Sequence, residues 1–391
     1  MYENLILLGA GATAAISGSS LPTAGNFFTS NAEWSDHKSD FPHLALAYKK
    51  VEHLKNKSCD KKSVTLTDIW LFIDTFTKYH SVITYNSSYN FRLLRLRYKE
   101  YGNSLPDYLS LRYFDSNYNE LYADMRPLPS RLEKYIYHTF PRQDPVNYFL
   151  ILAGWELKYL NYKTYGPEKA MNGYYKGLLQ RLTKENISVS VISFNWDIYF
   201  ERASKEEGCS IQLALNDNEK HDNNIIYLCK PHGGWNIPHV DNLVLPFPTL
   251  SDSIEDRLFD KVENMEVRPA MIPYFLGPDE ISEEHGFAFP NVGGYFKVQQ
   301  EVMKKMFKAA KNIVSIGYSF PEDDRHVLNL IKSIHNRKEK RLLCILKGND
   351  EEKNRIKNIW EFNDGNNSFD YQGNGFNGDS AEKIANWIKN E

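Results

Sequence analysis

Cysteine is scarce in this chain, and its spacing excludes the common metal and disulfide frameworks. The 391 residues include four cysteines with no C-x-x-C pair among them: Cys59, Cys209, Cys229 and Cys344. A structural zinc site needs closely spaced cysteine and histidine ligands, so this pattern predicts none. Reduced thiols in a cytoplasmic protein are the simplest interpretation, and we expect no metal.

Long apolar runs and an excess of charge are also missing. No run approaches the roughly 20 apolar residues of a membrane helix, and no basic segment precedes the apolar run at the N-terminus. The formal net charge of -3 and the pI near 6.4 disfavour a protein that neutralises a phosphate backbone. We therefore expect a protein that stays out of the membrane, with nucleic acid as a disfavoured partner.

Apolar residues are abundant enough, at 42%, for a sizeable core in one large domain or two. Between residues 41 and 186 they recur at helical spacing, and from residue 187 they form short runs separated by helical segments. Strand, helix, strand is the order of right-handed crossovers in a parallel sheet. The sequence predicts an α/β protein with a Rossmann-like, doubly wound parallel sheet in residues 1–40 and 187–391 and a large helical insertion at 41–186.

The stretch from Leu5 to Gly11 is the first signal for a ligand site. Four apolar residues run directly into Gly9, Ala10 and Gly11, as a buried parallel strand does where its backbone meets a phosphate. Glycines let main-chain N–H groups approach a pyrophosphate, and the following helix N-terminus adds partial positive charge. The third glycine of the usual dinucleotide fingerprint is absent, so a plain strand-to-loop turn stays open.

Three later segments place polar residues at the expected carboxyl ends of strands, where open α/β sheets bind ligands. They are Asn195 and Asp197, His232, and Gly317 with Ser319. Each segment also has an ordinary structural alternative. Asp197 suits a helix N-cap, a lone histidine in a turn is commonly structural, and the acidic Asp323 and Asp324 favour a helix N-terminus.

In their order, these four segments resemble the sirtuin domain. The matching pieces are the Gly-Ala-Gly opening, a Ser/Thr-Gln-Asn-Ile-Asp-like segment at 193–197, a His-Gly at 232–233 and a Gly-x-Ser at 317–319. The extended form Ile-Gly-Tyr-Ser-Phe-Pro-Glu-Asp-Asp-Arg-His-Val at 316–327 looks especially like the bacterial sirtuin-like branch associated with defence against phage. The resemblance does not cover the helical block.

The resemblance implies NAD as the ligand and suggests which residues hold each part of it. The residues so assigned are Gly9, Ala10, Gly11 and Thr13 for the pyrophosphate, Asn195 and Asp197 for the nicotinamide and its ribose, His232 as the catalytic histidine, Gly317 and Ser319 for phosphate or adenosine ribose, and Asn349 for the adenosine half.

The chain also departs from deacylase sirtuins. Their four-cysteine zinc ribbon is absent, residues 22–28 replace their Pro-Asp-Phe-Arg segment, and Phe194 stands where they have glutamine. We therefore expect hydrolysis of NAD to nicotinamide and ADP-ribose, without zinc. This chemistry requires a site that stabilises a developing sugar cation and admits water. In this hypothesis Asn195 positions ribose or water, Asp197 holds the carboxamide and His232 takes a proton.

By family analogy, such an enzyme depletes NAD in infected bacteria, as in abortive infection, and idles until it is triggered. We expect a homo-oligomer or a partner such as a HerA-type ATPase. A nuclease subunit of such a complex is one alternative, for which Asp323, Asp324 and the basic run 92–99 are the only signals. A regulatory module that binds NAD or ADP-ribose, or a protein deacylase, is the other.

Overall fold

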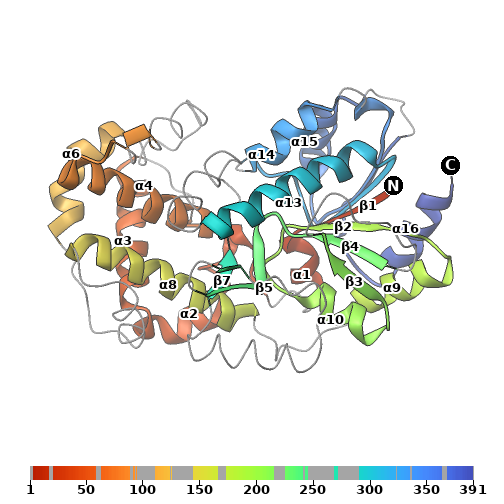
Figure 1. The fold of residues 1–391 in the computed structure, drawn as a ribbon, viewed down its shortest axis with the longest axis horizontal. Coiled ribbons are helices and arrows are strands. Elements are labelled where there is room, and N and C mark those ends of the chain that lie inside the picture. Colours follow the sequence, from red (N-terminus) through yellow and green to blue (C-terminus); the bar gives the residue numbers. More distant parts are fainter. Residues whose placement is uncertain are drawn as a thin grey trace. The chain divides into compact units, whose positions relative to one another are not determined.

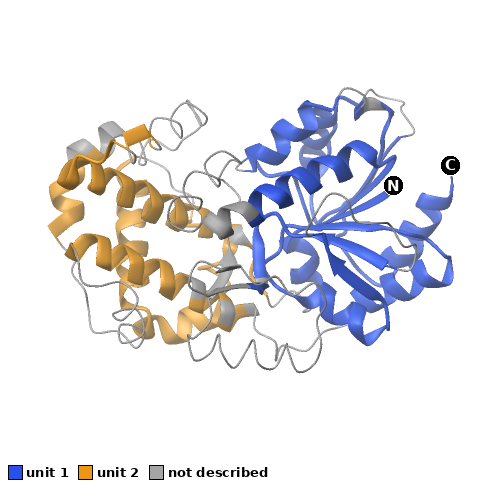
Figure 2. Ribbon diagram, viewed as in Figure 1, with its two compact units in different colours: residues 1–20, 167–391 blue, residues 21–166 orange. Residues whose placement is uncertain are grey.

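The computed structural model describes residues 3–16, 21–58, 63–88, 91–92, 94, 111–123, 125, 144–165, 173–214, 225–240, 243–244, 268–271, 290–322, 324–334, 337–362 and 368–390. The chain divides into two compact units (Figure 2): unit 1 comprises residues 1–20 and 167–391, and unit 2 comprises residues 21–166. The segment 167–186, predicted as the end of the helical block, lies in unit 1.

Unit 1 is built on a sheet of seven parallel strands in its described residues (Figure 1). Their order is β10-β9-β8-β1-β2-β4-β3. The strands are β1 (Asn4–Leu8), β2 (Ser190–Ser193), β3 (Ser210–Leu213), β4 (Ile225–Cys229), β8 (Asn312–Ile316), β9 (Arg341–Ile345) and β10 (Phe369–Gln372).

Helices cover both faces of this sheet because its central strands are apolar on both sides. In β1 the four side chains of Leu5–Leu8 are fully buried, as a strand between two helical layers requires. One face packs against α13 (Pro290–Ala309), α14 (Arg325–Lys332) and α15 (Asp350–Trp360). Figure 1 shows the opposite face covered by α1 (Ala10–Ile16), α9 (Tyr174–Lys184), α10 (Tyr199–Glu206) and α16 (Ser380–Lys389). The predicted doubly wound, Rossmann-like fold is confirmed.

The strand order reverses at β1. Strands β2, β4 and β3 lie on one side of β1, and β2 pairs with it directly. The later strands β8, β9 and β10 lie on the other side, where β8 pairs with β1. In open α/β sheets, ligands bind outside the carboxyl ends of the strands at such a switch point. The row of strand carboxyl ends around β1 is called the carboxyl edge below.

Some strands carry no clear sequence signal. The edge strands β3 and β10 are only partly buried and are not continuous apolar runs. The sequence also does not predict a second, antiparallel sheet of order β6-β5-β7 in unit 1. It comprises β5 (Gly233–Val240), β6 (Leu243–Val244) and β7 (Arg268–Met271).

The regular elements described in unit 2 are helices and 3₁₀ turns. It contains α2 (Ala32–His37), α3 (Pro42–Lys57), α4 (Leu66–Tyr85), α6 (Leu111–Ala123), α8 (Pro145–Tyr165) and the short 3₁₀ turns η1 (Ala24–Asn26) and η2 (Lys38–Asp40). A capping box starts α4, where Thr65 and Asp68 satisfy each other's backbone N–H groups. The fully buried Glu156 joins α8 to α3 by accepting a hydrogen bond from the Leu44 N–H at 2.8 Å and by contacting His43 Nδ1 at 2.6 Å.

In the part of the chain that the structure describes, no helix combines the length and apolarity needed to cross a membrane. Cys209, Cys229 and Cys344 are free thiols, as expected. Cys59 lies outside the described residues.

Candidate functional site

Gly9, Gly11 and Gly317 hold the carboxyl ends of β1 and β8 against each other. An ideal Cβ on Gly9 would lie 2.5 Å from the Gly317 carbonyl oxygen, and one on Gly317 would lie 1.9 Å from the Ala12 nitrogen. Gly317 also has a φ of +65°, which glycine adopts without strain. A side chain at either position would collide with backbone.

At the same junction, the backbone amides of Gly9 and Gly11, which we expected to bind a pyrophosphate, donate hydrogen bonds within the protein. The Gly9 N–H donates to the Ile316 carbonyl at 3.0 Å, and the Gly11 N–H donates to the Gly317 carbonyl at 3.1 Å. In this structure the glycine pattern therefore serves the close packing of two strand ends. Ala10 beside them is exposed.

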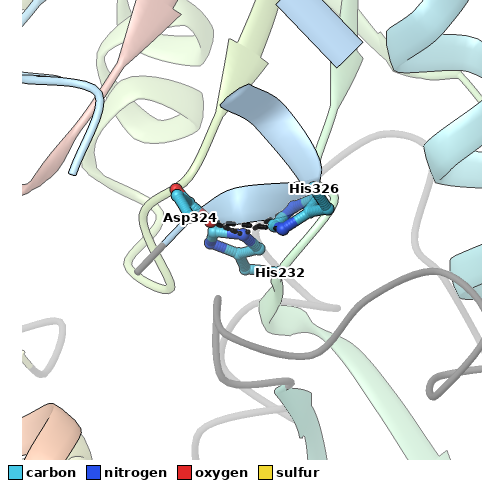
Figure 3. Close-up of side chains that lie close together, drawn as sticks. All are labelled: His232, Asp324 and His326. Carbon is cyan, nitrogen blue, oxygen red and sulfur yellow. Dashed lines mark hydrogen bonds and ion pairs between the residues drawn. The ribbon is translucent and has the colours of Figure 1, made fainter. Parts of the chain in front are cut away.

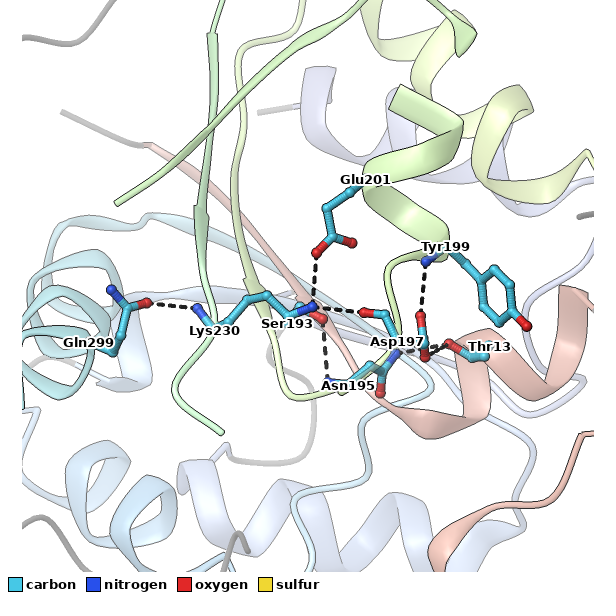
Figure 4. Close-up of polar contacts among 8 residues, drawn as sticks. All are labelled: Thr13, Ser193, Asn195, Asp197, Tyr199, Glu201, Lys230 and Gln299. Carbon is cyan, nitrogen blue, oxygen red and sulfur yellow. Dashed lines mark hydrogen bonds and ion pairs between the residues drawn. The ribbon is translucent and has the colours of Figure 1, made fainter. Parts of the chain in front are cut away.

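Thr13, Asn195 and Asp197 form one hydrogen-bonded group at the carboxyl edge (Figure 4). The Thr13 hydroxyl donates to Asp197 Oδ2 at 2.8 Å. The Asn195 amide nitrogen donates to Thr13 Oγ1 and to the Gly9 carbonyl, both at 3.1 Å. All three side chains are buried, so residues 184 positions apart in sequence are held in one geometry.

The Gly9 carbonyl determines which way the Asn195 amide faces. A carbonyl oxygen can only accept, so the amide nitrogen lies on that side and the amide oxygen on the other. Within the described residues, no hydrogen bond reaches this oxygen. It can therefore accept a hydrogen bond from a ligand hydroxyl or from water.

Asp197 has a structural role as well. Its Oδ1 accepts a hydrogen bond from the Tyr199 N–H at 3.1 Å, in the first turn of α10. This contact resembles the helix N-cap that the sequence allowed as the structural alternative for Asp197. Burial raises the pKa of Asp197 to about 6, although Lys230 and Thr13 act to lower it.

Lys230 ties three elements together behind this group. Its Nζ donates to Glu201 Oε1 of α10 at 2.8 Å and to the Asp197 carbonyl at 2.7 Å. Its backbone N–H donates to Gln299 Oε1 of α13 at 2.8 Å (Figure 4). Sequence reasoning missed this lysine, whose only signal is its position directly after a strand.

His232 follows β4 and meets two side chains from the start of α14 (Figure 3). Its Nε2 lies 3.2 Å from Asp324 Oδ1 and 3.3 Å from His326 Nε2. All three side chains are buried. The His232 carbonyl also accepts from Trp196 Nε1 at 3.1 Å, which links this loop to the Asn195–Asp197 segment.

Asp324 stands at the N-cap position of α14, yet its side chain does not cap the helix. Its Oδ2 instead accepts from the Tyr318 hydroxyl at 2.6 Å. Burial would raise the pKa of Asp324, but His232, His326 and the hydrogen bonds hold it below the ordinary value of a carboxyl. A helix start was expected here, whereas the partnership with two histidines was not.

Aromatic rings adjoin this cluster. Phe194 stacks on Tyr318 with ring centroids 4.0 Å apart, and its centroid lies 5.2 Å from that of His232. An apolar ring therefore lies directly beside His232.

The two remaining predicted residues serve local structure. The Asn349 side chain accepts from the Glu352 N–H at 3.2 Å and so caps α15. Ser319 is half-buried, and its carbonyl accepts from the Arg355 guanidinium. Of the nuclease signals, Asp323 lies outside the described residues, as does most of the run 92–99.

Comparisons with known proteins returned no matching family model and no matching curated protein. The sirtuin-like pattern therefore stays a resemblance of four short segments. What the structure adds is that these segments come from strand ends of one sheet.

Proposed function

We propose that unit 1 binds NAD at its carboxyl edge and hydrolyses the bond between nicotinamide and ribose. The observation that carries this proposal is the buried group of Thr13, Asn195 and Asp197 at the switch point of a doubly wound sheet. A hydrogen bond joins its segment to the His232 loop.

Asn195 is suited to holding a ribose hydroxyl or the attacking water, because its amide oxygen faces away from the Gly9 carbonyl that fixes the nitrogen. The leaving group is a neutral pyridine, so the protein needs mainly to stabilise positive charge on the sugar. Both oxygens of Asp197 already accept hydrogen bonds within the protein. We therefore assign Asp197 to positioning Thr13 and Asn195, and no longer to holding the carboxamide.

His232 is suited to accepting a proton from the water or from a ribose hydroxyl. Asp324 lies 3.2 Å from its Nε2 and can orient the ring. The family analogy extends this proposal to NAD depletion in phage-infected bacteria, with a homo-oligomer or a HerA-type ATPase as the means of activation.

The test is product analysis with the full chain in EDTA. Wild type is expected to release nicotinamide and ADP-ribose from NAD, and His232→Ala and Asn195→Ala are expected to lose at least about 100-fold in rate. His53→Ala, an exposed histidine of unit 2, is the matched control and keeps the wild-type rate.

Calorimetric titration of the same proteins with NAD separates the outcomes. Stable binding without product from wild type would favour the regulatory module that only binds NAD. If wild type neither binds NAD nor releases product, the proposal as a whole is ruled out.

A further inference from the structure

We propose that His232, Asp324 and His326 form a binding site for a divalent transition-metal ion of the zinc type. The three side chains come from two separate elements, the turn after β4 and the start of α14. One ligand atom from each lies within 4.8 Å of the other two. Figure 3 shows the two imidazole rings and the carboxylate converging on one point.

The spacing of the atoms fits such an ion. Nitrogen and oxygen ligands bind zinc at about 2.0–2.1 Å, and in a tetrahedral arrangement they lie roughly 3.3 Å apart. The His232 Nε2 is 3.3 Å from His326 Nε2 and 3.2 Å from Asp324 Oδ1. The third pair, between His326 and Asp324, lies within 4.8 Å, so an ion can be accommodated if this pair closes by up to about 1.5 Å.

Asp324 supplies a second, independent observation. Its Oδ1 is buried and faces both imidazoles, at 3.2 Å from His232 Nε2 and 3.4 Å from His326 Nδ1. The Tyr318 hydroxyl donates to the other oxygen and so fixes the carboxylate with Oδ1 turned toward the histidines. A buried carboxylate is costly unless positive charge lies beside it, and a cation bound between Oδ1 and the two imidazoles would supply that charge.

The ligand set indicates the class of ion. Imidazole nitrogens suit zinc and other late first-row transition metals, whereas magnesium and calcium prefer ligand sets made of oxygen atoms alone. Two histidines and one carboxylate also leave a coordination position open for water or another ligand. This inference departs from the expectation of no metal, which rested on the spacing of the cysteines and on the missing zinc ribbon.

The ion and the proposed catalysis make incompatible demands on His232. With the Nε2 facing Asp324, the ring accepts a proton at Nδ1. An ion bound to Nε2 leaves the proton of the neutral ring on Nδ1, so the ion-bound protein is the idle form of the proposed hydrolase. That consequence rests on the proposed function, but the site itself does not, and metal binding is measured without NAD.

The experiment is a calorimetric titration of the EDTA-treated and dialysed full chain with ZnCl2. Wild type is expected to bind a single Zn²⁺ per chain, and Asp324→Asn and His326→Gln are each expected to lose at least about tenfold in affinity. His53→Ala is the control for exposed histidines and is expected to bind as wild type does. Circular dichroism checks that each variant is folded.

Wild-type protein alone gives a second measurement if a variant does not fold. Co²⁺ bound by two imidazoles and a carboxylate in four- or five-coordinate geometry absorbs visible light far more strongly than aqueous, octahedral Co²⁺. The site would be overturned if Co²⁺ kept its aqueous spectrum in the presence of the protein. It would also be overturned if wild type bound no Zn²⁺, or if both variants bound Zn²⁺ as tightly as wild type.

Discussion

Asp197 shows at the scale of a single residue how tertiary structure changes a carboxyl. Its two oxygens accept hydrogen bonds from Thr13 and from the backbone of α10, yet burial raises its pKa from 3.8 to about 6. The charged form is thus less favourable in the folded protein than in the unfolded chain.

Replacing Asp197 by asparagine should remove a loss in the free energy of unfolding that occurs in wild type as pH rises. Between about pH 4 and 6 the folded state holds a proton that the unfolded state has released, so wild-type stability falls relative to Asp197→Asn as pH rises, by up to about 3 kcal/mol. Lys230, Glu201, Tyr175 and Tyr199 face this carboxyl and are the same in both proteins. Urea unfolding of both proteins across this range measures the difference. A difference that does not change with pH would contradict the argument.

At the scale of elements, the junction of β1 and β8 depends on the missing side chain of Gly317. Its backbone has positive φ and touches the start of α1. Gly208, which follows α10, has a similar φ of +68° but no atom within 4 Å of its ideal Cβ. Comparing substitutions at the two glycines therefore separates the cost of positive φ, which both share, from the cost of a collision with backbone, which only Gly317 has.

Gly317→Ala and Gly208→Ala form a matched pair. Gly208→Ala carries only the strain of positive φ and should lower the free energy of unfolding by about 1–2 kcal/mol. Gly317→Ala adds a collision with backbone and should lower it by about 1–3 kcal/mol more. Urea unfolding at neutral pH compares them, and equal losses would show that the β1–β8 contact yields easily.

At the scale of the whole molecule, the two units each have their own buried polar anchor. In unit 2 the fully buried Glu156 holds α8 to α3 through His43 and Leu44. In unit 1 the buried Lys230 holds β4, α10 and α13 through Glu201 and Gln299. Each unit should therefore respond separately to a local defect.

Glu156→Ala tests this separation. Removing one partner of a buried pair costs about 3–5 kcal/mol, and we expect faster amide hydrogen exchange in α3 and α8 with little change in β1 and β8. Gly317→Ala should produce the reverse pattern. Exchange followed by mass spectrometry measures both proteins, and a uniform increase across the chain in either variant would indicate a single cooperative unit.

By itself the sequence determined the class of fold and the positions of the strand-end segments. Buried parallel strands such as β1 and β8 are continuous apolar runs, and long helices such as α4 and α8 have apolar residues at helical spacing, so local pattern predicts both. Short, half-buried strands such as β10 carry no such pattern.

Only the tertiary structure decided what the site residues do. Gly9 and Gly11 follow a phosphate-binding pattern, but their amides donate to the carbonyls of Ile316, at the end of β8, and of Gly317, which follows it. Asp324 was predicted only to favour a helix start, but the fold brings it and His326 to His232, more than 90 positions away in sequence. Hydrogen bonds and ligand distances join residues that are far apart along the chain, so local pattern carries no information about them.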